Sequence, residues 1–233
     1  MTDHQLDSTP LTAQQPGTVD TRDMIEVHRA VRREFGLMPA MVRATAAGDT
    51  ARAKTVAGHI DLMSRLLAIH HGEEDRQLWP KLLQRVPDQL SPVVALMETQ
   101  HEQIHQASEA AAALLPPWTA TAAPRAGVRL AGVLDQLCTV LNEHLSAEEQ
   151  HILPLAARHL TEQEWEHLGA DGCAQVPKKE LPLVFGMLMY EGDPEVTGSM
   201  LAHAPALARL VMPVLGPRAY TRYARRVHLT ATP

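Results

Sequence analysis

Histidine and glutamate recur at helical spacing in two similar stretches of the chain. The first stretch covers residues 70–80 (HHGEEDRQLWP), and the second, residues 144–154 (HLSAEEQHILP), follows 74 positions later. In each stretch a histidine precedes a glutamate by four residues, and a proline closes the stretch. Residues four apart lie on the same face of a helix, so each stretch aims an imidazole and a carboxylate at one place. The repeated residues are therefore metal-ligand types.

Two further features extend this pattern. His101 and His105 form another pair four residues apart, and His28 lies in an amphipathic segment near the start. Imidazole and carboxylate groups without thiolates suit iron or manganese, and zinc could also bind. Seven ligands are too many for one tetrahedral zinc ion but suit two octahedral ions that share both carboxylates. The candidate ligands are His28, His70, Glu74, His101, His105, His144 and Glu148.

The repeat also predicts that the two ions differ. At an offset of 73 residues His28 aligns with His101, and Arg32 then aligns with His105. One ion would receive three histidines and the other two, which leaves an open position on the second ion. Oxygen, peroxide or nitric oxide could bind there. Two buried carboxylates that face each other cost several kcal/mol each, so bound metal should stabilise the fold.

The composition predicts helices that pack on helices. Hydrophobic residues make up 45% of the 233 residues but aromatic residues only 3%, so the core must consist mostly of small and aliphatic side chains. Apolar residues recur at helical spacing in four long segments, which predicts an all-α, up-down-up-down four-helix bundle. The prolines at 80 and 154 should kink or end their helices, and residues 116–124 should form a loop. The expected helices cover residues 20–48, 50–86, 92–115 and 125 onward.

The chain divides into three parts on this interpretation. Residues 1–19 are polar and acidic, lack the features of a signal peptide, and are predicted to be disordered. Residues 20–158 form the bundle, and residues 159–233 form a short helical C-terminal extension that opens with a capping box at 161–164. The apolar residues 181–190 need a cover, for which the bundle is the default. A partner or a second copy of the chain are the alternatives.

Charge and cysteine content exclude several kinds of partner. A net charge of −6 gives no overall attraction to nucleic acid or to an anionic membrane, and the arginines near the C-terminus are predicted to be a solvated face. No apolar run reaches the roughly 18 residues that cross a bilayer. Two cysteines cannot form a disulfide framework and suit a reducing compartment. We expect a cytoplasmic monomer or homodimer.

The ordered set of seven ligands resembles hemerythrin and the bacterial hemerythrin-like (HHE cation-binding) domains. The resemblance covers about residues 20–158, and the His-x-x-x-Glu form of the last motif places the chain with the bacterial domains. Residues after about 160 resemble the extension of actinobacterial members. The resemblance implies a non-haem di-iron centre, with an oxo or hydroxo bridge. His28 and His70 would bind one iron, His101, His105 and His144 the other, and Glu74 and Glu148 would bridge them.

The family resemblance implies two classes of function. The first is a protein that binds oxygen, nitric oxide or peroxide for sensing, storage or delivery. The second is a di-iron enzyme that breaks down peroxide or activates oxygen. Ferritin-like iron storage is a weaker interpretation, because those sites are rich in carboxylates with Glu-x-x-His spacing.

Several other polar residues keep two interpretations open. His59 and Met63 could line a ligand channel or belong to the core, and Arg32 could contact a bound anion or lie at the surface. Glu73 and Asp75 fall one residue off the ligand face, where they would be solvated or would contact a ligand from outside. Six further histidines are predicted to have surface or capping roles: His71, His151, His159, His167, His203 and His228.

Overall fold

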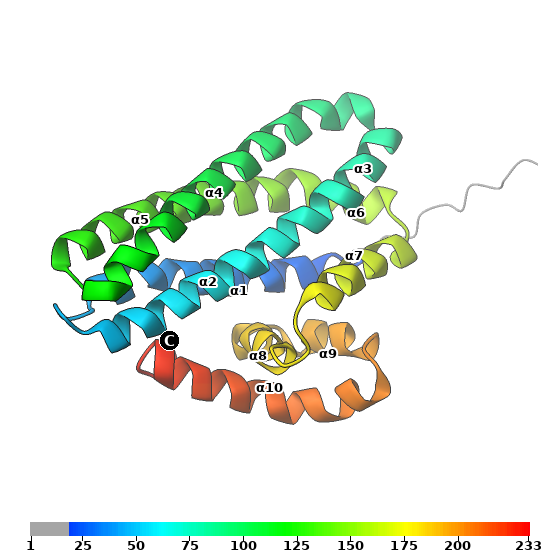
Figure 1. The fold of residues 1–233 in the computed structure, drawn as a ribbon. Helices are drawn as coiled ribbons and strands as arrows, with labels where there is room; N and C mark the ends of the chain where they lie inside the picture. Colours follow the sequence, from blue (N-terminus) through cyan, green and yellow to red (C-terminus); the bar gives the residue numbers. More distant parts are fainter. Residues whose placement is uncertain (1–18) are drawn as a thin grey trace, which may run out of the picture.

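The computed structural model describes residues 19–233, apart from the side chains of residues 88, 89, 91 and 92. Within this range the chain is helical and contains no strand, which confirms the predicted all-α class (Figure 1). The predicted disordered segment lies outside the described residues except for Val19. That residue is buried, and its backbone N–H donates to the carbonyl oxygen of Ala157 at 2.9 Å.

Four long helical segments, called legs below, form the bundle. The helix α1 packs against α2 and α5, and α4 packs against the same two helices, which confirms the four-helix arrangement. Two of the legs contain a π-helical turn, η1 or η2, between two α-helices. In chain order the legs are α1 (Arg22–Arg43); α2 (Thr50–Glu73), η1 (Glu74–Leu78) and α3 (Trp79–Arg85); α4 (Pro87–Thr121); and α5 (Pro124–Ala147), η2 (Glu148–Ile152) and α6 (Leu153–His159).

The two prolines of the repeat coincide with these π turns. Pro80 and Pro154 lie in the first turn of α3 and α6. The residue before each proline donates its N–H five residues back, to the carbonyl oxygens of Glu74 and Glu148 respectively. Proline has no N–H to donate to the fourth preceding residue, so a wider turn accommodates it. Each leg therefore continues beyond its proline instead of ending there.

The predicted loop at residues 116–124 is wrong for its first part, because α4 continues to Thr121. Two threonine hydroxyls donate to the carbonyl oxygens of Pro116 and Pro117, and Trp118 is buried, which anchors this last stretch. The helix ends where Ala122 adopts a left-handed conformation with φ of 47°. The other end of α4 also differs, since the helix begins at Pro87 and not near residue 92. Proline is well suited to a first turn.

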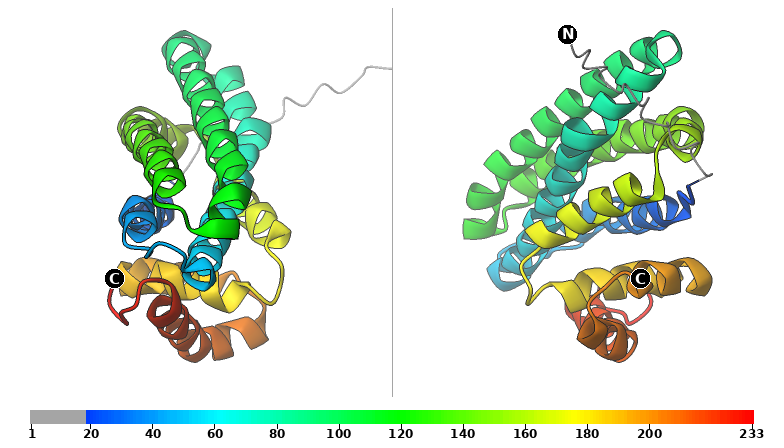
Figure 2. Two further views of the ribbon diagram at one scale, coloured as in Figure 1. Left: turned by 60° about the vertical axis from the view of Figure 1, so that its left-hand side comes forward. Right: turned by 90° about the vertical axis from the view of Figure 1, so that its right-hand side faces the viewer.

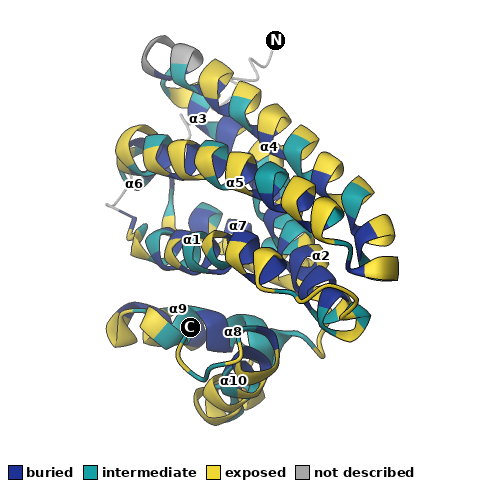
Figure 3. Ribbon diagram, turned by 90° about the vertical axis from the view of Figure 1, so that its left-hand side faces the viewer, coloured by how far each residue is buried: buried dark blue, intermediate teal, exposed yellow. Residues whose placement is uncertain are grey.

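Buried residues line the inner faces of the legs (Figure 3). They form two apolar clusters, one on each side of the candidate ligands along the legs. Leu67, Leu141 and Leu145 belong to the first cluster, whereas Leu78 and Ile152 belong to the second. The polar ligands are therefore held between two well-packed apolar regions.

The C-terminal extension consists of helices α7 (Glu162–Gln175), α8 (Leu181–Glu191), α9 (Pro194–Ala202) and α10 (Ala206–Val227). The capping box predicted at its start is present, with Thr161 and Glu164 as its two members. The helix α7 packs against α2 and η1, while α8 and α9 contact α1 and α10 contacts α2 (Figure 2). The apolar helix α8 is thus covered by the bundle and by α10.

The helices α8 and α10 approach each other most closely at two glycines. A Cβ atom added to Gly186 would lie 2.1 Å from the carbonyl oxygen of Gly216, so no larger residue fits at position 186. None of the described helices is long and apolar enough to cross a membrane.

Candidate metal centre

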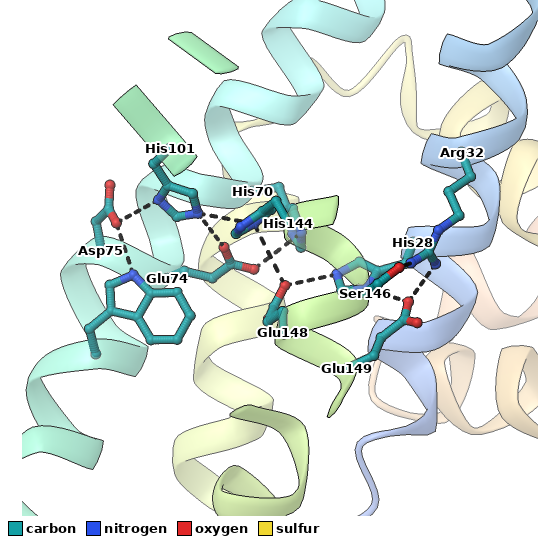
Figure 4. Close-up of polar contacts among 11 residues, drawn as sticks. His28, Arg32, His70, Glu74, Asp75, His101, His144, Ser146, Glu148 and Glu149 are labelled. Carbon is teal, nitrogen blue, oxygen red and sulfur yellow. Dashed lines mark hydrogen bonds and ion pairs between the residues drawn. The ribbon is translucent and has the colours of Figure 1, made fainter. Parts of the chain in front are cut away.

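Two glutamates open the two π turns and occupy the centre of the bundle. Glu74 is the first residue of η1 and Glu148 the first residue of η2, and both are fully buried. Figure 4 shows their carboxylates surrounded by imidazole rings from the neighbouring helices. Because π turns are rare and often occur at functional sites, the matching positions of these two point to the same centre.

The side chains around these glutamates fall into two groups that share Glu74. In each group the nitrogen and oxygen atoms lie within 4.8 Å of one another, as a metal ion would require. The first group is His28, His70, Glu74 and Glu148, and the second is His71, Glu74, His101 and His144.

Short distances connect the members of each group. In the first, His28 Nε2 lies 3.2 Å from Glu148 Oε2, and His70 Nε2 lies 3.1 Å from Glu74 Oε1. In the second, His101 Nε2 lies 3.5 Å from Glu74 Oε2. Each carboxylate thus faces histidines from other helices as well as its own.

The outer nitrogens of two histidines are held by carboxylates in matching positions of the repeat. His28 Nδ1 lies 2.9 Å from Glu149 Oε1, and His101 Nδ1 lies 2.9 Å from Asp75 Oδ1. An ionised carboxylate can only accept, so each Nδ1 carries the proton and each Nε2 faces the centre. This is the usual support of a metal-binding histidine. Asp75, which the sequence left open, therefore contacts a ligand from outside.

Further donors fix these two carboxylates. Trp79 donates its indole N–H to Asp75 Oδ1 at 2.9 Å. Arg32 donates to Glu149 and also to the hydroxyl of Ser146. Arg32 therefore contacts His28 indirectly, through Glu149, a role that differs from both of those predicted from the sequence.

The structure brings six of the seven predicted ligands together but not His105. The side chain of His105 is 63% exposed, and its Nδ1 lies 3.8 Å from Glu109 Oε2. Its place as the fifth imidazole is taken by His71, which is buried. The ring of His71 stacks on His101 at a centroid distance of 4.1 Å and meets His144 edge-on at 4.9 Å.

The sequence contained one signal for His71 that the repeat obscured. His71 precedes Glu74 by three residues, a spacing that also places two side chains on one helix face. The matching position in the second stretch is Leu145, so the alignment gave His71 no counterpart. The centre still comprises five histidines and two glutamates.

Burial and neighbouring charge set the protonation of the histidines. Burial acts to lower the pKa of His28, but the charge and hydrogen bond of Glu148, together with Glu149 and Glu74, outweigh it and raise that pKa to about 9. Burial also acts to lower the pKa of His101, but hydrogen bonds and charge from Asp75 and Glu74 outweigh it and raise that pKa to about 9. Burial lowers the pKa of His70 to about 3 and that of His144 to about 4. Metal binding would therefore displace protons from His28 and His101.

Burial and neighbouring charge also give the two glutamates different pKa values. Burial and the nearby charge of Glu148 raise the pKa of Glu74. For Glu148, burial acts upward, but the charge of His28 lowers its pKa below the usual value. Two carboxylates that share one site cannot both ionise easily without a cation between them.

Many polar atoms in the centre have no hydrogen-bond partner among the described residues. A buried polar atom without a partner costs about 1–3 kcal/mol, and such atoms are rare in folded proteins. Here they converge on one place, and they are the atoms that would bind a cation. They are Nε2 of His28, His70 and His71 and both carboxylate oxygens of Glu74 and Glu148, whereas His144 directs its Nε2 to the centre, 3.2 Å from His101 Nε2. The donor set thus fits iron, manganese or zinc.

A groove of about 500 Å³ leads from the surface to one side of the centre. It lies between α2 and α4, and His71 and His101 form part of its lining. His105 and Ser108, one and two turns further along α4, line the same groove. His105 therefore faces the approach to the centre without belonging to it.

A helical bundle with such a cluster of histidines and glutamates defines a metal-binding protein. In agreement with this, residues 19–168 match the family model of the hemerythrin HHE cation binding domain. The match covers more than half of the chain, which therefore belongs to this family. No curated protein and no solved structure gave a match to the chain.

Proposed function

We propose that the chain is a non-haem di-iron protein that binds oxygen, or a related ligand such as nitric oxide or peroxide, for sensing, storage or delivery. One observation carries this proposal. Five imidazoles and two carboxylates converge in two groups that share Glu74, and most of their inward atoms lack a hydrogen-bond partner. A histidine-rich set without cysteine favours iron over a sulfur-ligated metal.

Each ion would have its own histidines. His28 and His70 would hold one ion, whereas the other ion would be held by His71, His101 and His144. Glu74 and Glu148 would bridge the pair, and manganese or zinc could replace iron at the same residues. When bound, reduced iron supplies electrons and an open coordination position to a small ligand. By ligand count, the ion with two histidines keeps that position.

The protein's own residues hold the centre ready for metal. Asp75 and Glu149 orient His101 and His28 through their Nδ1 atoms. The apolar clusters on both sides exclude bulk water and hold the rings in place. Without metal, Glu148 would be ionised and Glu74 would hold a proton. When cations bind, Glu74 would lose that proton and both side chains would be carboxylates. The centre is thus oriented before metal arrives.

The groove between α2 and α4 is the route by which we expect a small ligand to enter. It reaches the edges of His71 and His101, whereas His28 is fully buried. A diatomic molecule would pass between the two helices, reach the centre from the His101 side and then pass that ion to the open position beside His28 and His70. Ser108 lies in this lining and could be enlarged without touching a ligand.

A di-iron enzyme that acts on peroxide or activates oxygen is the second candidate. The observation in its favour is a set of ionisable side chains in the lining of the groove, namely His105, Asp75, Glu98 and Glu102. Such groups could carry protons to a reacting ligand. His59, considered from the sequence as a channel residue, does not line this groove.

Two unpaired cysteines agree with a reducing compartment. Cys138 and Cys173 form no disulfide, which is typical of cytoplasmic proteins. We therefore infer a cytoplasmic protein.

The test is rapid mixing of the anaerobic, ferrous-loaded protein with oxygen, with iron counted on the same sample. We expect about two irons per chain and a visible absorption change that reverses when oxygen is removed. Irreversible oxidation followed by steady peroxide consumption would favour the enzyme, and one iron or none would overturn the di-iron proposal.

A variant pair tests the groove in the same experiment. Ser108→Trp should slow the association phase about tenfold or more while the iron content stays unchanged, because the indole fills the route. Ala112→Trp, one turn further along α4 and exposed, is the matched control and should react at the normal rate. Equal rates in all three proteins would exclude the groove as the entry.

A further inference from the structure

A second cluster of metal-ligand residues lies where the extension meets the bundle. Glu34 comes from α1, His59 from α2, and His228 directly follows α10. Their ligand atoms all lie within 4.8 Å of one another. None of the three belongs to the di-iron centre, and the sequence assigned none of them a metal.

The geometry directs three atoms at one point. Glu34 Oε2 lies 3.0 Å from His228 Nε2 and 3.7 Å from His59 Nε2. The side chains of Glu34 and His59 have no exposed surface, and that of His228 is only 3% exposed. Two imidazole nitrogens from different segments thus face the same carboxylate oxygen. His59 Nε2 also lies 3.4 Å from the backbone carbonyl oxygen of Glu34.

Neighbouring side chains hold the outer atoms of these ligands. The hydroxyl of Tyr220 donates to Glu34 Oε1 at 2.5 Å, and Arg33 Nε donates to the same oxygen at 3.0 Å. The hydroxyl of Tyr223 lies 2.8 Å from His59 Nδ1. Carboxylates and histidines that bind metals are typically supported in this way from outside. The inner atoms therefore remain directed at one another.

The expected charges also suit a cation. Burial raises and hydrogen bonds from His228 and Tyr220 lower the pKa of Glu34, with a net value of about 2, so the carboxylate is ionised. Burial lowers the pKa of His59 to about 4, so its imidazole is neutral. An ionised carboxylate and a neutral imidazole are the forms that bind metal. His228 Nδ1 is buried and has no hydrogen-bond partner within residues 19–233.

We propose that Glu34, His59 and His228 form a separate site for a single divalent transition-metal ion. Two imidazoles and one carboxylate are a common ligand set for zinc and for ferrous iron, with the remaining position left to water or another small ligand. Because the ligands come from α1, α2 and the residue after α10, the ion would fasten the extension to the bundle. Arg33, which also binds Glu191, contacts the carboxylate of Glu34 from the side away from the two imidazoles' Nε2 atoms, at Oε1.

The alternative is a hydrogen-bonded contact without metal, and one substitution separates the two. His228→Gln can still donate a hydrogen bond to Glu34 but loses the imidazole ligand. The matched control is His203→Gln, an exposed histidine paired with Glu166. Neither residue belongs to the di-iron centre.

The experiment counts zinc in full-length protein that has been stripped of metal, reloaded with Zn²⁺ and freed of excess ion. We expect the unaltered protein and His203→Gln each to bind one more zinc ion per chain than His228→Gln. Chelation should also lower the melting temperature of the unaltered protein and of His203→Gln more than that of His228→Gln. Equal zinc content in all three would overturn the second site and leave the di-iron proposal untouched. If His228→Gln loses its helical circular dichroism, the zinc count of the unaltered protein decides. Two ions per chain would contradict the site at Glu34, His59 and His228, and three would support it.

Discussion

The two sides of the candidate metal centre carry similar residues but face different surroundings. The His28 side consists of His28, His70, Glu148 and Glu149; the His101 side consists of His71, His101, His144 and Asp75, and Glu74 serves both. Each side has a π turn and a carboxylate on an Nδ1 atom, but only the His101 side borders the groove. The repeat thus provides two similar metal-binding halves, and residues outside the repeat distinguish them.

The largest effect should follow removal of Glu148, the fully buried carboxylate that faces His28. Glu148→Ala should lose most bound metal and lower stability by about 3–5 kcal/mol, because it leaves the charge of His28 buried without its partner. Metal analysis and denaturant unfolding on the same preparation measure both effects. Glu143→Ala, an exposed carboxylate on the same helix, is the control. Unchanged metal content in Glu148→Ala would contradict its role as a metal ligand.

A second pair of variants tests which histidine completes the His101 side. His71→Ala should lose about one of two ions, whereas His105→Ala should keep both, since His105 lies exposed in the groove. Iron counted after reconstitution distinguishes them. The reverse outcome would restore His105 as the ligand and remove His71.

The outer carboxylates should show a smaller, matched effect on the two sides. Asp75→Asn and Glu149→Gln should each weaken metal affinity about 10–100-fold, the usual consequence of losing a partner of a metal-binding histidine. Competition with a chelator of known affinity measures this. Arg32→Gln should weaken metal affinity less than either of these variants, because Arg32 acts only through Glu149. Affinities equal to that of the unaltered protein would mean that the Nδ1 contacts do not support the metal.

The smallest effect belongs to a contact outside both sides. The Arg85 guanidinium, at the end of α3, lowers the pKa of Glu164 in α7 from 4.5 to about 2. A lowered folded-state pKa gives stability that is complete above pH 4.5 and is lost as the pH falls toward 2. Both groups are partly exposed, so the contribution is about 0–1 kcal/mol.

Urea unfolding of metal-free protein checks this value. Arg85→Gln should be less stable than the unaltered protein at pH 7, and the difference should shrink as the pH approaches 2. A difference that stays constant at low pH would mean that packing, and not the ion pair, is responsible.

The fold and most of the centre could be predicted from the sequence because both depend on local spacing. A four-residue interval fixes the face on which His70 and Glu74 lie, and the same interval fixes His144 and Glu148. The long apolar stripes fix the number of legs. These signals do not depend on how the helices meet.

The remaining features depend on contacts that spacing does not reveal. The same interval aligned His105 with His101, but the way α4 packs leaves His105 at the groove and exposed. The repeat obscured the three-residue spacing of His71 to Glu74, and the contact of its ring with His101 comes from the packing of α4 on α2. The helix passes Pro116 and Pro117 because two threonine hydroxyls and Trp118 secure its end. His228 meets Glu34 across 194 residues, a distance no local pattern spans.

The most direct test of the central claim is an anomalous difference map, measured at the iron absorption edge, from crystals of the iron-loaded protein. We predict two peaks between the π turns, one within bonding distance of His28 and His70 Nε2 and the other within bonding distance of His71, His101 and His144. Glu74 should lie between them. A single peak, or a peak bound by His105 with His71 turned away, would contradict the assignment of the two sides.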